Sequence, residues 1–411
     1  MDEQQIIIVG AGAAGIGAAL ECAARGVPYT VLEASGRVGG RAYTAAAGLP
    51  VPWDHGCHWL HCANVNPLVE WADRLGATYV RQQSANTAFS VCDGGRFQDA
   101  AGVAACDGAV TRAFDAVEAA GRDVPIPEVL PDAGRWAPAV GLILALMAGD
   151  DAANVSASAY ADYEDTDHNW PLLSGYGALI TAMADGLNIR TGMAVNAIHQ
   201  SAAGAHVVTD QGDLKAAGVI VTASTNVLAR GGIRFGPGPA ADLAAALNHV
   251  PCGVYEKVAF ALDAIPDALS QTRFLTVQQG GHDMATNFQI MRGDVPMMLC
   301  HMAGKKARAL VAAGPEAMAV YARGALIEAF GARIEDRITG TATTNWTNDP
   351  LILGSYSHAV PGAAQLRRDM IARDTGTVAF AGEAFSPKWQ ATAHGAYTSG
   401  RHVAARMAEQ L

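Results

Sequence analysis

Three glycines near the start of the chain have the spacing of a phosphate-binding turn. Gly10, Gly12 and Gly15 follow the apolar run QIIIV and open the stretch AAGIGAALECAARG, so they lie between an expected strand and an expected helix. Gly10 allows the tight turn, Gly12 lets the backbone approach a pyrophosphate, and Gly15 lets helix and strand pack closely. Glu33 closes the next expected strand, where its carboxylate can accept hydrogen bonds from a ribose diol. These residues predict a site for a dinucleotide such as NAD or FAD.

A second group of residues continues directly from Glu33. The segment EASGRVGGRAYT contains Arg37, Gly39, Gly40 and Arg41. The two glycines let a loop lie against a bound cofactor, and the two arginines can fork onto phosphate oxygens. This segment therefore extends the predicted dinucleotide site.

Lys257 lies in the middle of GVYEKVAFALD, which has the β-branched and aromatic residues of a strand. Because side chains alternate along a strand, Lys257 shares its face with Tyr255, Ala259 and Ala261. On this segment alone, a surface strand with its lysine in water is the simpler interpretation. The rest of the sequence favours a lysine that points into a site.

The elements expected around these residues are those of an α/β protein. A βαβ unit occupies roughly residues 5–33 and begins a parallel sheet. The chain from 66 to about 169 is expected to be largely helical, with proline-rich joints. Strands return in GLNIRTGMAVNAIHQ, AHVVTDQG and GVIVTAS, and a last strand, TVAFAG, precedes a C-terminal helix.

The composition narrows the classes of partner. The 411 residues are 50% hydrophobic and carry a formal charge of -11, which indicates a globular protein and argues against nucleic-acid and anionic-membrane partners. The seven cysteines form no Cys-x-x-Cys pair, as expected for free thiols in a reducing compartment. The N-terminal stretch lacks the features of a signal peptide, and the apolar run WAPAVGLILALMAG is too short to span a membrane. We expect a soluble, cytoplasmic protein, with a homodimer as one option for its oligomeric state.

Three further stretches make a family resemblance specific. The chain contains DHGCHWLH from Asp54, WTNDPLILGSYS from Trp346 and FAGEAFSPKWQATAHGAYTSG from Phe380. Together with EASGRVGGRAYT, they resemble the flavin-containing amine oxidase family of monoamine and polyamine oxidases and lysine-specific histone demethylases. The resemblance covers both ends of the chain, whereas residues from about 84 to 157 match nothing in that family.

The resemblance implies a fold and a division of the chain. It implies a doubly wound, Rossmann-like domain of the two-dinucleotide-binding type that binds FAD, together with a discontinuous α+β substrate domain. The FAD-binding domain would comprise residues 1–65, 175–250 and 350–411. The substrate domain would comprise residues 66–174 and 251–349.

The resemblance also assigns roles at the reacting end of the cofactor. Lys257 would point through a water toward flavin N5, with the small residues beside it making room for the ring. Tyr356 and Trp59 would shape the substrate site, with Trp389 as a further wall. Thr392 would cap the last helix, whose N-terminus would face the pyrimidine side of the flavin.

Further cofactor contacts are implied at Val195, Trp346, Glu383 and Ala393. In the family, the residue matched by Glu383 hydrogen-bonds the phosphate-ribityl region, and the backbone at Val195 would contact the adenine. Ser355 stands where monoamine oxidases carry the cysteine that links the flavin. We therefore expect FAD to be bound non-covalently.

The implied reaction is oxidation of a primary amine or polyamine. A neutral amine delivers hydride to flavin N5, the imine hydrolyses, and dioxygen is reduced to hydrogen peroxide. Three alternatives stay open: an L-amino-acid oxidase, a flavin desaturase and a non-catalytic flavoprotein that binds a partner protein. The first would need an arginine for the substrate carboxylate, and Arg230, Arg234 and Arg292 are candidates.

Other polar clusters have simpler interpretations. One such cluster comprises His55, Cys57, His58, His61 and Cys62. These residues are too closely spaced for a usual zinc site, and we expect no metal. His58 and His61 are candidates for the active-site lining. His394 either approaches the flavin or lies in solvent at the first turn of its helix. The acids of YADYEDTDHNWP either attract a polyamine at the entrance or form a solvated loop.

Overall fold

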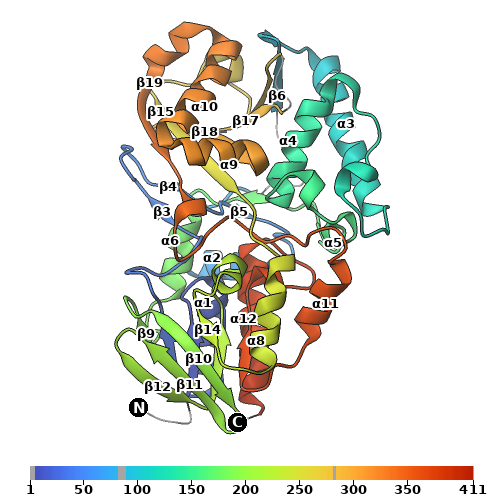
Figure 1. Ribbon diagram of the computed structural model, residues 1–411. Helices are drawn as coiled ribbons and strands as arrows, with labels where there is room; N and C mark the ends of the chain where they lie inside the picture. The colour runs from blue at the N-terminus through green and yellow to red at the C-terminus, as the bar shows by residue number, and fades with distance from the viewer. Residues whose placement is uncertain (1–4, 82–88, 281–283, 411) are drawn as a thin grey trace.

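Two sheets, each assembled from distant segments, organise the molecule, as Figure 1 shows for the computed structural model. The structure describes residues 5–81, 89–280 and 284–410. The lower part in Figure 1 contains a parallel sheet with the strand order β20-β13-β1-β2-β9. The bounds of these strands are Val378–Phe380, Gly218–Val221, Ile6–Val9, Tyr29–Leu32 and Ile189–Arg190. The predicted α/β class with a Rossmann-like dinucleotide domain is confirmed.

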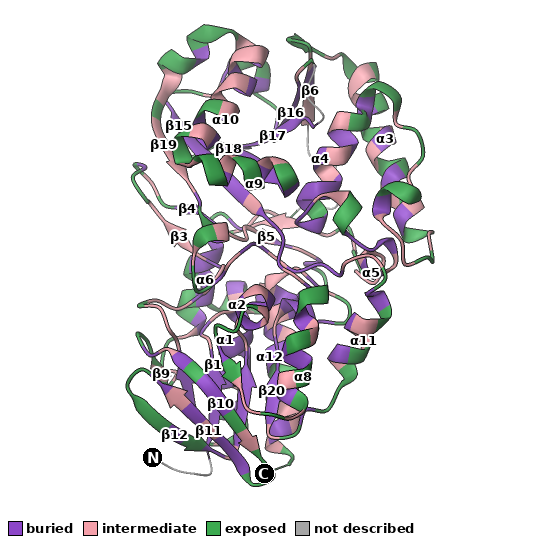
Figure 2. Cartoon of the chain, viewed as in Figure 1, coloured by how far each residue is buried: buried purple, intermediate pink, exposed green. Residues whose placement is uncertain are grey.

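Alternate residues of β1 pack into two different cores. Ile6 and Ile8 face a cluster that includes the helices α1 (Ala13–Arg25) and α12 (Ala393–Ala408). Ile7 and Val9 face a second cluster on the other side of the sheet. A strand that is covered on both faces needs an apolar residue at every position, which explains the unbroken run IIIV. Figure 2 shows this buried central layer in purple.

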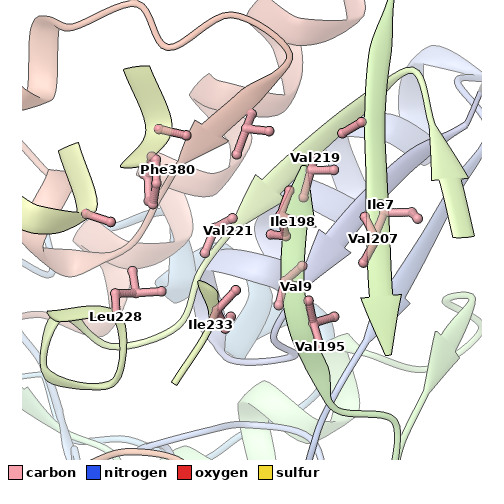
Figure 3. Close-up of a cluster of buried hydrophobic side chains, with 14 of the residues drawn as sticks. Ile7, Val9, Val195, Ile198, Val207, Val219, Val221, Leu228, Ile233 and Phe380 are labelled. Atoms are coloured by element: carbon pink, nitrogen blue, oxygen red, sulfur yellow. The ribbon is translucent and has the colours of Figure 1, made fainter. Parts of the chain in front are cut away.

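A small second sheet supplies the covering layer on the side of Ile7 and Val9. Its strand order is β12-β11-β10-β14, with bounds Gly212–Ala216, Gly204–Thr209, Val195–Ser201 and Arg234–Phe235. The first three strands form an antiparallel meander, in which β10 and β11 lie in stretches predicted as strands. Figure 3 shows side chains of this sheet, such as Val195 and Val207, packed with those of β1 and β13.

The upper part of the molecule is built on a seven-stranded sheet. Its strand order is β19-β15-β18-β17-β16-β6-β7, with bounds Ile338–Thr343, Tyr255–Leu262, Met297–Ala303, Thr286–Met291, Phe274–Gln278, Phe89–Asp93 and Arg96–Phe97. The helices α9 (Gly304–Ala313) and α10 (Pro315–Phe330) cover one face and pack on Val258 and Phe260 of β15. Lys257 therefore points to the opposite face.

Helices α3 (Ala100–Glu118) and α4 (Ala137–Ala148) stand beside this sheet (Figure 1), and the short helix α5 (Ala157–Tyr160) packs on α3. The apolar run from Trp136 forms the buried helix α4, which packs against β16, β17 and β18. The expectation of a largely helical region misses the strands β6 and β7. Because β6 pairs with the distant strand β16, its conformation depends on a partner that local periodicity does not reveal.

The remaining elements connect and flank the two parts. The α-helices are α2 (Pro67–Arg74), α6 (Tyr176–Met183), α7 (Thr225–Ala229), α8 (Pro239–Ala246) and α11 (Ala364–Ala372). The two-stranded pairs are β3 (Thr44–Ala45) with β4 (Trp53–Asp54), and β5 (Trp59–Leu60) with β8 (Trp170–Pro171). Short 3₁₀ helices span Ile126–Glu128, Gly134–Trp136, Ala152–Asn154, Leu247–His249, Asp267–Leu269, Ala332–Arg337, Trp346–Asn348 and Glu383–Phe385.

We retain as a proposal the division of the chain into FAD-binding segments (1–65, 175–250, 350–411) and substrate segments (66–174, 251–349). Residues 1–4, 82–88, 281–283 and 411 of that division lie outside the described residues. Helix α2, from a proposed substrate segment, packs with α1, α6 and α12 on the cofactor side. All seven cysteines are free thiols. Among the helices in the described ranges, none has the length and apolarity that a bilayer crossing requires.

Candidate active site

One cavity of about 1230 Å³ is lined by residues from both parts of the molecule. It is larger than the ~300–1,000 Å³ of most small-molecule sites, as a site for both a dinucleotide and a substrate requires. The predicted residues that line it are Gly10, Gly12, Glu33, Arg37, Gly39, Gly40, Arg41, Trp59, Val195, Lys257, Trp346, Tyr356, Glu383, Thr392 and Ala393. The structure thus brings together residues that are distant in the sequence. Two predicted residues, Gly15 and Trp389, are not among the described residues that line the cavity.

The glycine turn after β1 has the geometry that its sequence predicts. Gly10 has a φ of +103°, in the region that favours glycine. A Cβ atom at Gly15 would lie 1.8 Å from the carbonyl oxygen of Gly10, so Gly15 is needed for the close approach of α1 to the turn. Gly12 and Ala13 at the start of α1 line the cavity. The helix therefore presents unpaired N–H groups and its positive dipole end to a bound phosphate.

Glu33 follows β2 and helps to shape the same loop. One carboxylate oxygen accepts from the backbone N–H of Ala11, and the other accepts from that of Ser35, both at 2.8 Å. A carboxylate has about four lone-pair positions, so each oxygen retains capacity for a ribose hydroxyl.

The two predicted arginines differ in their surroundings. The guanidinium of Arg37 lies 4.1 Å from the centre of the Tyr43 ring and donates to the carbonyl oxygen of Gly40 at 2.8 Å. Arg41 donates to the carbonyl oxygen of Ser355 and to Oε1 of Glu383, the latter at 3.0 Å. Arg41 is therefore already paired with a buried carboxylate.

Glu383 links three segments of the cavity wall. Besides Arg41, it accepts from the backbone N–H and the hydroxyl of Ser357, at 3.1 and 2.7 Å, and from the backbone N–H of Ala391 at 3.1 Å. These bonds tie the end of β20 to the segment that contains Ser355 and to the loop before α12. Direct contact of Glu383 with the cofactor stays a proposal.

The first turn of α12 borders the cavity. Thr392 is its N-cap, and Thr392 Oγ1 accepts from the backbone N–H of Gly395 at 3.0 Å, which confirms the predicted capping role. Ala393 and His394 follow and also line the cavity. His394 is 1% exposed, so a solvated histidine is excluded, and burial lowers its pKa to about 3.

Lys257 is buried, with 1% of its surface exposed. Its Nζ donates to the carbonyl oxygens of Asp54 and Gly56, at 2.9 and 2.6 Å, and lies 3.3 Å from Nδ1 of His58. Burial lowers the pKa of Lys257 to about 8, against the opposing effects of Asp54 and Cys57. This environment excludes the surface-strand interpretation, and burial makes Lys257 easier to deprotonate than a solvated lysine.

The small neighbours of Lys257 do not provide room for a flavin. Ala259 and Ala261 share its face of β15, but they pack against Leu49 and Trp53 in a separate apolar cluster. The expectation that they border the flavin ring is therefore wrong. Backbone from the β4–β5 segment, rather than open space, lies next to Lys257.

Glu256 is a residue whose part in the site the sequence analysis missed. It is fully buried and accepts from the hydroxyl of Thr344 and from the backbone N–H groups of Trp346 and Thr347, at 3.1 and 2.8 Å. It therefore positions the segment WTN and the cavity-lining Trp346. The sequence did contain one signal of this role, because Glu256 and Lys257 are adjacent charged residues in an otherwise apolar strand.

Aromatic rings form much of the wall near Lys257. Tyr356 lies 5.8 Å from Tyr255, and its hydroxyl donates to the carbonyl oxygen of Leu146. Trp59 stacks on Phe274 with ring centres 6.0 Å apart. These rings come from both parts of the chain and give an apolar boundary to a substrate. Tyr255 and Phe274 were not predicted as site residues.

Trp389 does not line this cavity. It borders a separate hollow of about 270 Å³, together with residues of α11 and α12. The expectation that Trp389 forms a wall of the substrate site is therefore wrong. Its ring instead packs at 5.2 Å from that of His394, which does line the main cavity.

The histidines and cysteines after Asp54 have separate partners. His55 stacks on Trp53, His61 bonds to Asn169 through Nδ1 at 2.7 Å, and Cys62 donates to the carbonyl oxygen of Glu164. Within the ranges that the structure describes, no three His, Cys, Asp or Glu side chains are arranged to hold a metal ion. His58 and His61 line the cavity, as proposed from the sequence.

The charged lining of the cavity is unevenly distributed. Its basic lining residues, among those described, are Arg37, Arg41 and Lys257. The three arginines proposed for an amino-acid carboxylate, Arg230, Arg234 and Arg292, do not line it. Exposed acids mark the rim: Asp107, Asp115 and Glu118 of α3, and Asp165 and Asp167 of the loop after α5.

The acidic loop near Trp170 thus contributes only partly to the rim. Asp162 forms ion pairs with Arg367 and Arg368, and Glu164 pairs with Lys388. The acids of α3 were not predicted as site residues.

The residues of the cavity fit FAD. Within the described chain, three buried polar atoms of its wall have no hydrogen-bond partner: Oγ of Ser355, Nδ1 of His358 and Nε2 of His394. A bound polar group would satisfy them. The glycine turn and the start of α1 suit a pyrophosphate, and Glu33 suits a ribose. These residues would hold the cofactor along the lower part of the cavity.

Sequence comparisons give the same assignment. Residues 131–408 match the family model for flavin containing amine oxidoreductases, and residues 8–75 match that for NAD(P)-binding Rossmann-like domains. The chain is 26% identical to a lysine-specific histone demethylase 1 homolog 2 of Arabidopsis thaliana, over 98% of this chain and 58% of that protein. It is also 26% identical to a lysine-specific histone demethylase 2 of Homo sapiens, over 98% of this chain and 53% of that protein. Polyamine oxidase 2 of Arabidopsis thaliana is 25% identical, with 96% of this chain and 86% of that protein covered.

Solved structures of similar fold have low sequence identity. Cyclohexylamine oxidase from Brevibacterium oxydans superimposes with a TM-score of 0.81 at 21% identity, over 100% of this chain and 99% of that one. Putrescine oxidase bound to putrescine superimposes with a TM-score of 0.81 at 18% identity, over 99% of each chain. Their likeness supports the fold, and the family model covers more than half of this chain. The protein is therefore a flavoprotein with FAD as its cofactor, and it belongs to the flavin-containing amine oxidoreductase family.

Proposed function

We propose that the chain oxidises a primary amine or polyamine. One observation carries this proposal. The same cavity is lined by the predicted dinucleotide-binding residues and by the aromatic rings near Lys257, and acidic residues lie at its rim. When bound, FAD accepts a hydride from the carbon that bears the amine and passes the electrons to dioxygen, giving hydrogen peroxide. Water then hydrolyses the resulting imine to an aldehyde, with release of ammonia or the residual amine.

The proposed roles of the residues follow from their surroundings. Tyr356 and Trp59 exclude water from the reacting end and favour the neutral form of an amine. Lys257 holds a proton or a water at Nζ. Thr392 and Ala393 direct the N-terminus of α12 toward the cofactor, where its dipole stabilises negative charge. The acids of α3 raise the local concentration of a cationic amine.

An anaerobic amine screen tests this proposal. The FAD-loaded protein is mixed without oxygen with a panel of monoamines, diamines and polyamines, and the visible absorbance of the oxidised flavin is followed. We expect at least one amine to bleach it, and hydrogen peroxide to form when air is admitted. If no amine bleaches a flavin that dithionite reduces fully, the amine oxidase proposal fails, and a non-catalytic flavoprotein becomes the better description.

The amino-acid oxidase alternative finds less support among the described lining residues. Its substrate carboxylate would need a cation in the chamber, but Arg41 is paired with Glu383, and the Nζ of Lys257 already bonds to Asp54, Gly56 and His58. We therefore favour an amine without a carboxylate.

A further inference from the structure

Lys257 has one neighbour that can exchange a proton with it. Two of its contacts, the carbonyl oxygens of Asp54 and Gly56, are acceptors only. The third is Nδ1 of His58 at 3.3 Å. An imidazole nitrogen can accept a proton or donate one, so it differs in kind from the two carbonyls. An Nζ–H bond broken at Lys257 can be replaced by an Nδ1–H bond at His58.

The ring of His58 is itself held in place. It stacks on the ring of His301 with centres 5.7 Å apart and an angle of 12° between the planes. His301 Nδ1 is bonded to the hydroxyl of Tyr255 at 2.7 Å. Lys257, Tyr255, His58 and His301 all line the cavity, and three strand or loop segments contribute them.

Few other charges act on this group. Among the described residues, the titratable side chains that interact with Lys257 or His58 are those of Asp54, His55, Cys57, His61 and His301. The carboxylate of Asp54 accepts from the backbone N–H groups of Tyr176 and Gly177 and from the hydroxyl of Thr44. Burial and the nearby Lys257 lower the pKa values of His58 and His301, so both rings are neutral near pH 7. The Lys257–His58 pair therefore holds its proton mainly at Nζ.

We propose that His58 is a positioning residue that directs the amine of Lys257 and exchanges its proton, and that His301 and Tyr255 fix the ring of His58. This inference rests on the proposed function, because it assigns the partner of the lysine at the reacting end of that site. It predicts that the protonation of Lys257 depends on an acceptor at the position of His58 Nδ1.

The test is a titration of Lys257 by NMR in the FAD-loaded protein. The sequence has five lysines, Lys215, Lys257, Lys305, Lys306 and Lys388, so ¹³C-labelled lysine gives few signals, and Lys257→Met identifies the one of interest. In His58→Leu the ammonium loses an acceptor. We expect the pKa of Lys257 to fall by about one unit, a tenfold change in proton dissociation.

Two further variants separate this effect from general disturbance. His58→Asn keeps an acceptor near the position of Nδ1 and should restore most of the pKa change. His206→Gln removes a half-exposed histidine of β11, outside the cavity, and should leave the Lys257 signal unchanged. A Lys257 pKa that is unchanged or raised in His58→Leu overturns the proposal, and so does a His58→Asn variant that behaves like His58→Leu.

A kinetic measurement ties the pair to the reaction. The rate of flavin reduction by an amine that bleaches the flavin is measured as a function of pH. In His58→Leu, the pKa that this profile gives for Lys257 should shift by the same amount as the pKa from the NMR titration. If no amine bleaches the flavin, the proposed function fails, while the NMR titration still decides the role of His58.

Discussion

At the scale of single residues, the burial of Lys257 has an energetic consequence. A lysine in the folded protein with a pKa of about 8 binds its proton less readily than the unfolded chain, where the pKa is the ordinary 10.5. Between these pH values the unfolded state binds more protons. The contribution of Lys257 to stability therefore rises with pH through this window and is lost as the pH falls toward 8.

Lys257→Met should remove this dependence. Methionine has a similar length and no charge, so the midpoint of thermal unfolding of the variant, relative to that of the wild type, should be highest at pH 8 and fall toward pH 10.5. Measurements on the FAD-loaded proteins at intervals across this range test the sign. Lys388→Met, at an exposed lysine, is the matched control and should show no such trend. A constant difference for Lys257→Met would mean that Lys257 is solvated in the folded protein.

Ser355 carries a second prediction at this scale. It occupies the position of the flavin-linking cysteine of monoamine oxidases, and a hydroxyl cannot form the thioether. Acid precipitation should therefore release the FAD into the supernatant, where its absorbance can be measured. Flavin that stays in the protein pellet would show a covalent link at another residue.

The sequence predicted residues whose roles are local better than residues whose roles depend on distant partners. Gly10 and Thr392 act within a few positions of themselves, so turn and capping rules were sufficient. The role of Glu256 depends on Trp346, which lies 90 residues further along the chain. His301 meets Tyr255 only because β15 and β18 pair in their observed register. Local patterns carry no information about such pairs.

At the scale of elements, the contact between α1 and α12 is set by small residues. A Cβ atom at Gly400 would lie 1.9 Å from the carbonyl oxygen of Ala14, and one at Gly17 would lie 2.4 Å from that of Tyr397. The neighbours are backbone atoms, which cannot move without shifting a helix. This contact positions both helix N-termini at the cavity, so a change here should affect cofactor binding as well as stability.

Gly400→Ala should therefore destabilise the protein, by about 1–3 kcal/mol if the helices separate slightly. Gly324→Ala in α10 is the matched control, because a Cβ atom there meets nothing within 4 Å. Alanine has the higher helix propensity, so this control should be neutral or stabilising by up to ~1 kcal/mol. Thermal unfolding and FAD affinity measured on both variants test the pair. Equal effects at the two positions would contradict the close helix contact.

Element type was predictable where periodicity is strong, and α4, α12 and β15 lie where the sequence placed them. The strands β6 and β7 were missed because they complete a sheet whose other strands lie much further along the chain. The site depends on this non-local assembly, since β16 and β18 contribute Phe274 and His301 to the cavity.

At the scale of the whole molecule, the charge of the cavity should select the substrate. The negative formal charge of the chain and the acids at the rim favour a cation. Apart from the arginines of the loop after β2, Lys257 is the basic residue among the described residues that line the cavity. Its burial disfavours the charged form. An ammonium can lose its proton on entry and be buried neutral, whereas a carboxylate would meet a Lys257 whose Nζ is already bonded to Asp54, Gly56 and His58.

The last prediction compares an amine with the α-amino acid that differs from it only by the carboxylate, such as phenethylamine and phenylalanine. Burial of an unpaired charge costs several kcal/mol, so the amine should reduce the flavin at least about 100-fold more efficiently. Anaerobic stopped-flow measurement of kcat/KM for flavin reduction gives the ratio directly. If the amino acid is preferred, Lys257→Met identifies the reason: loss of that preference in the variant would make Lys257 the partner of the carboxylate, and its retention would require an arginine to move into the chamber.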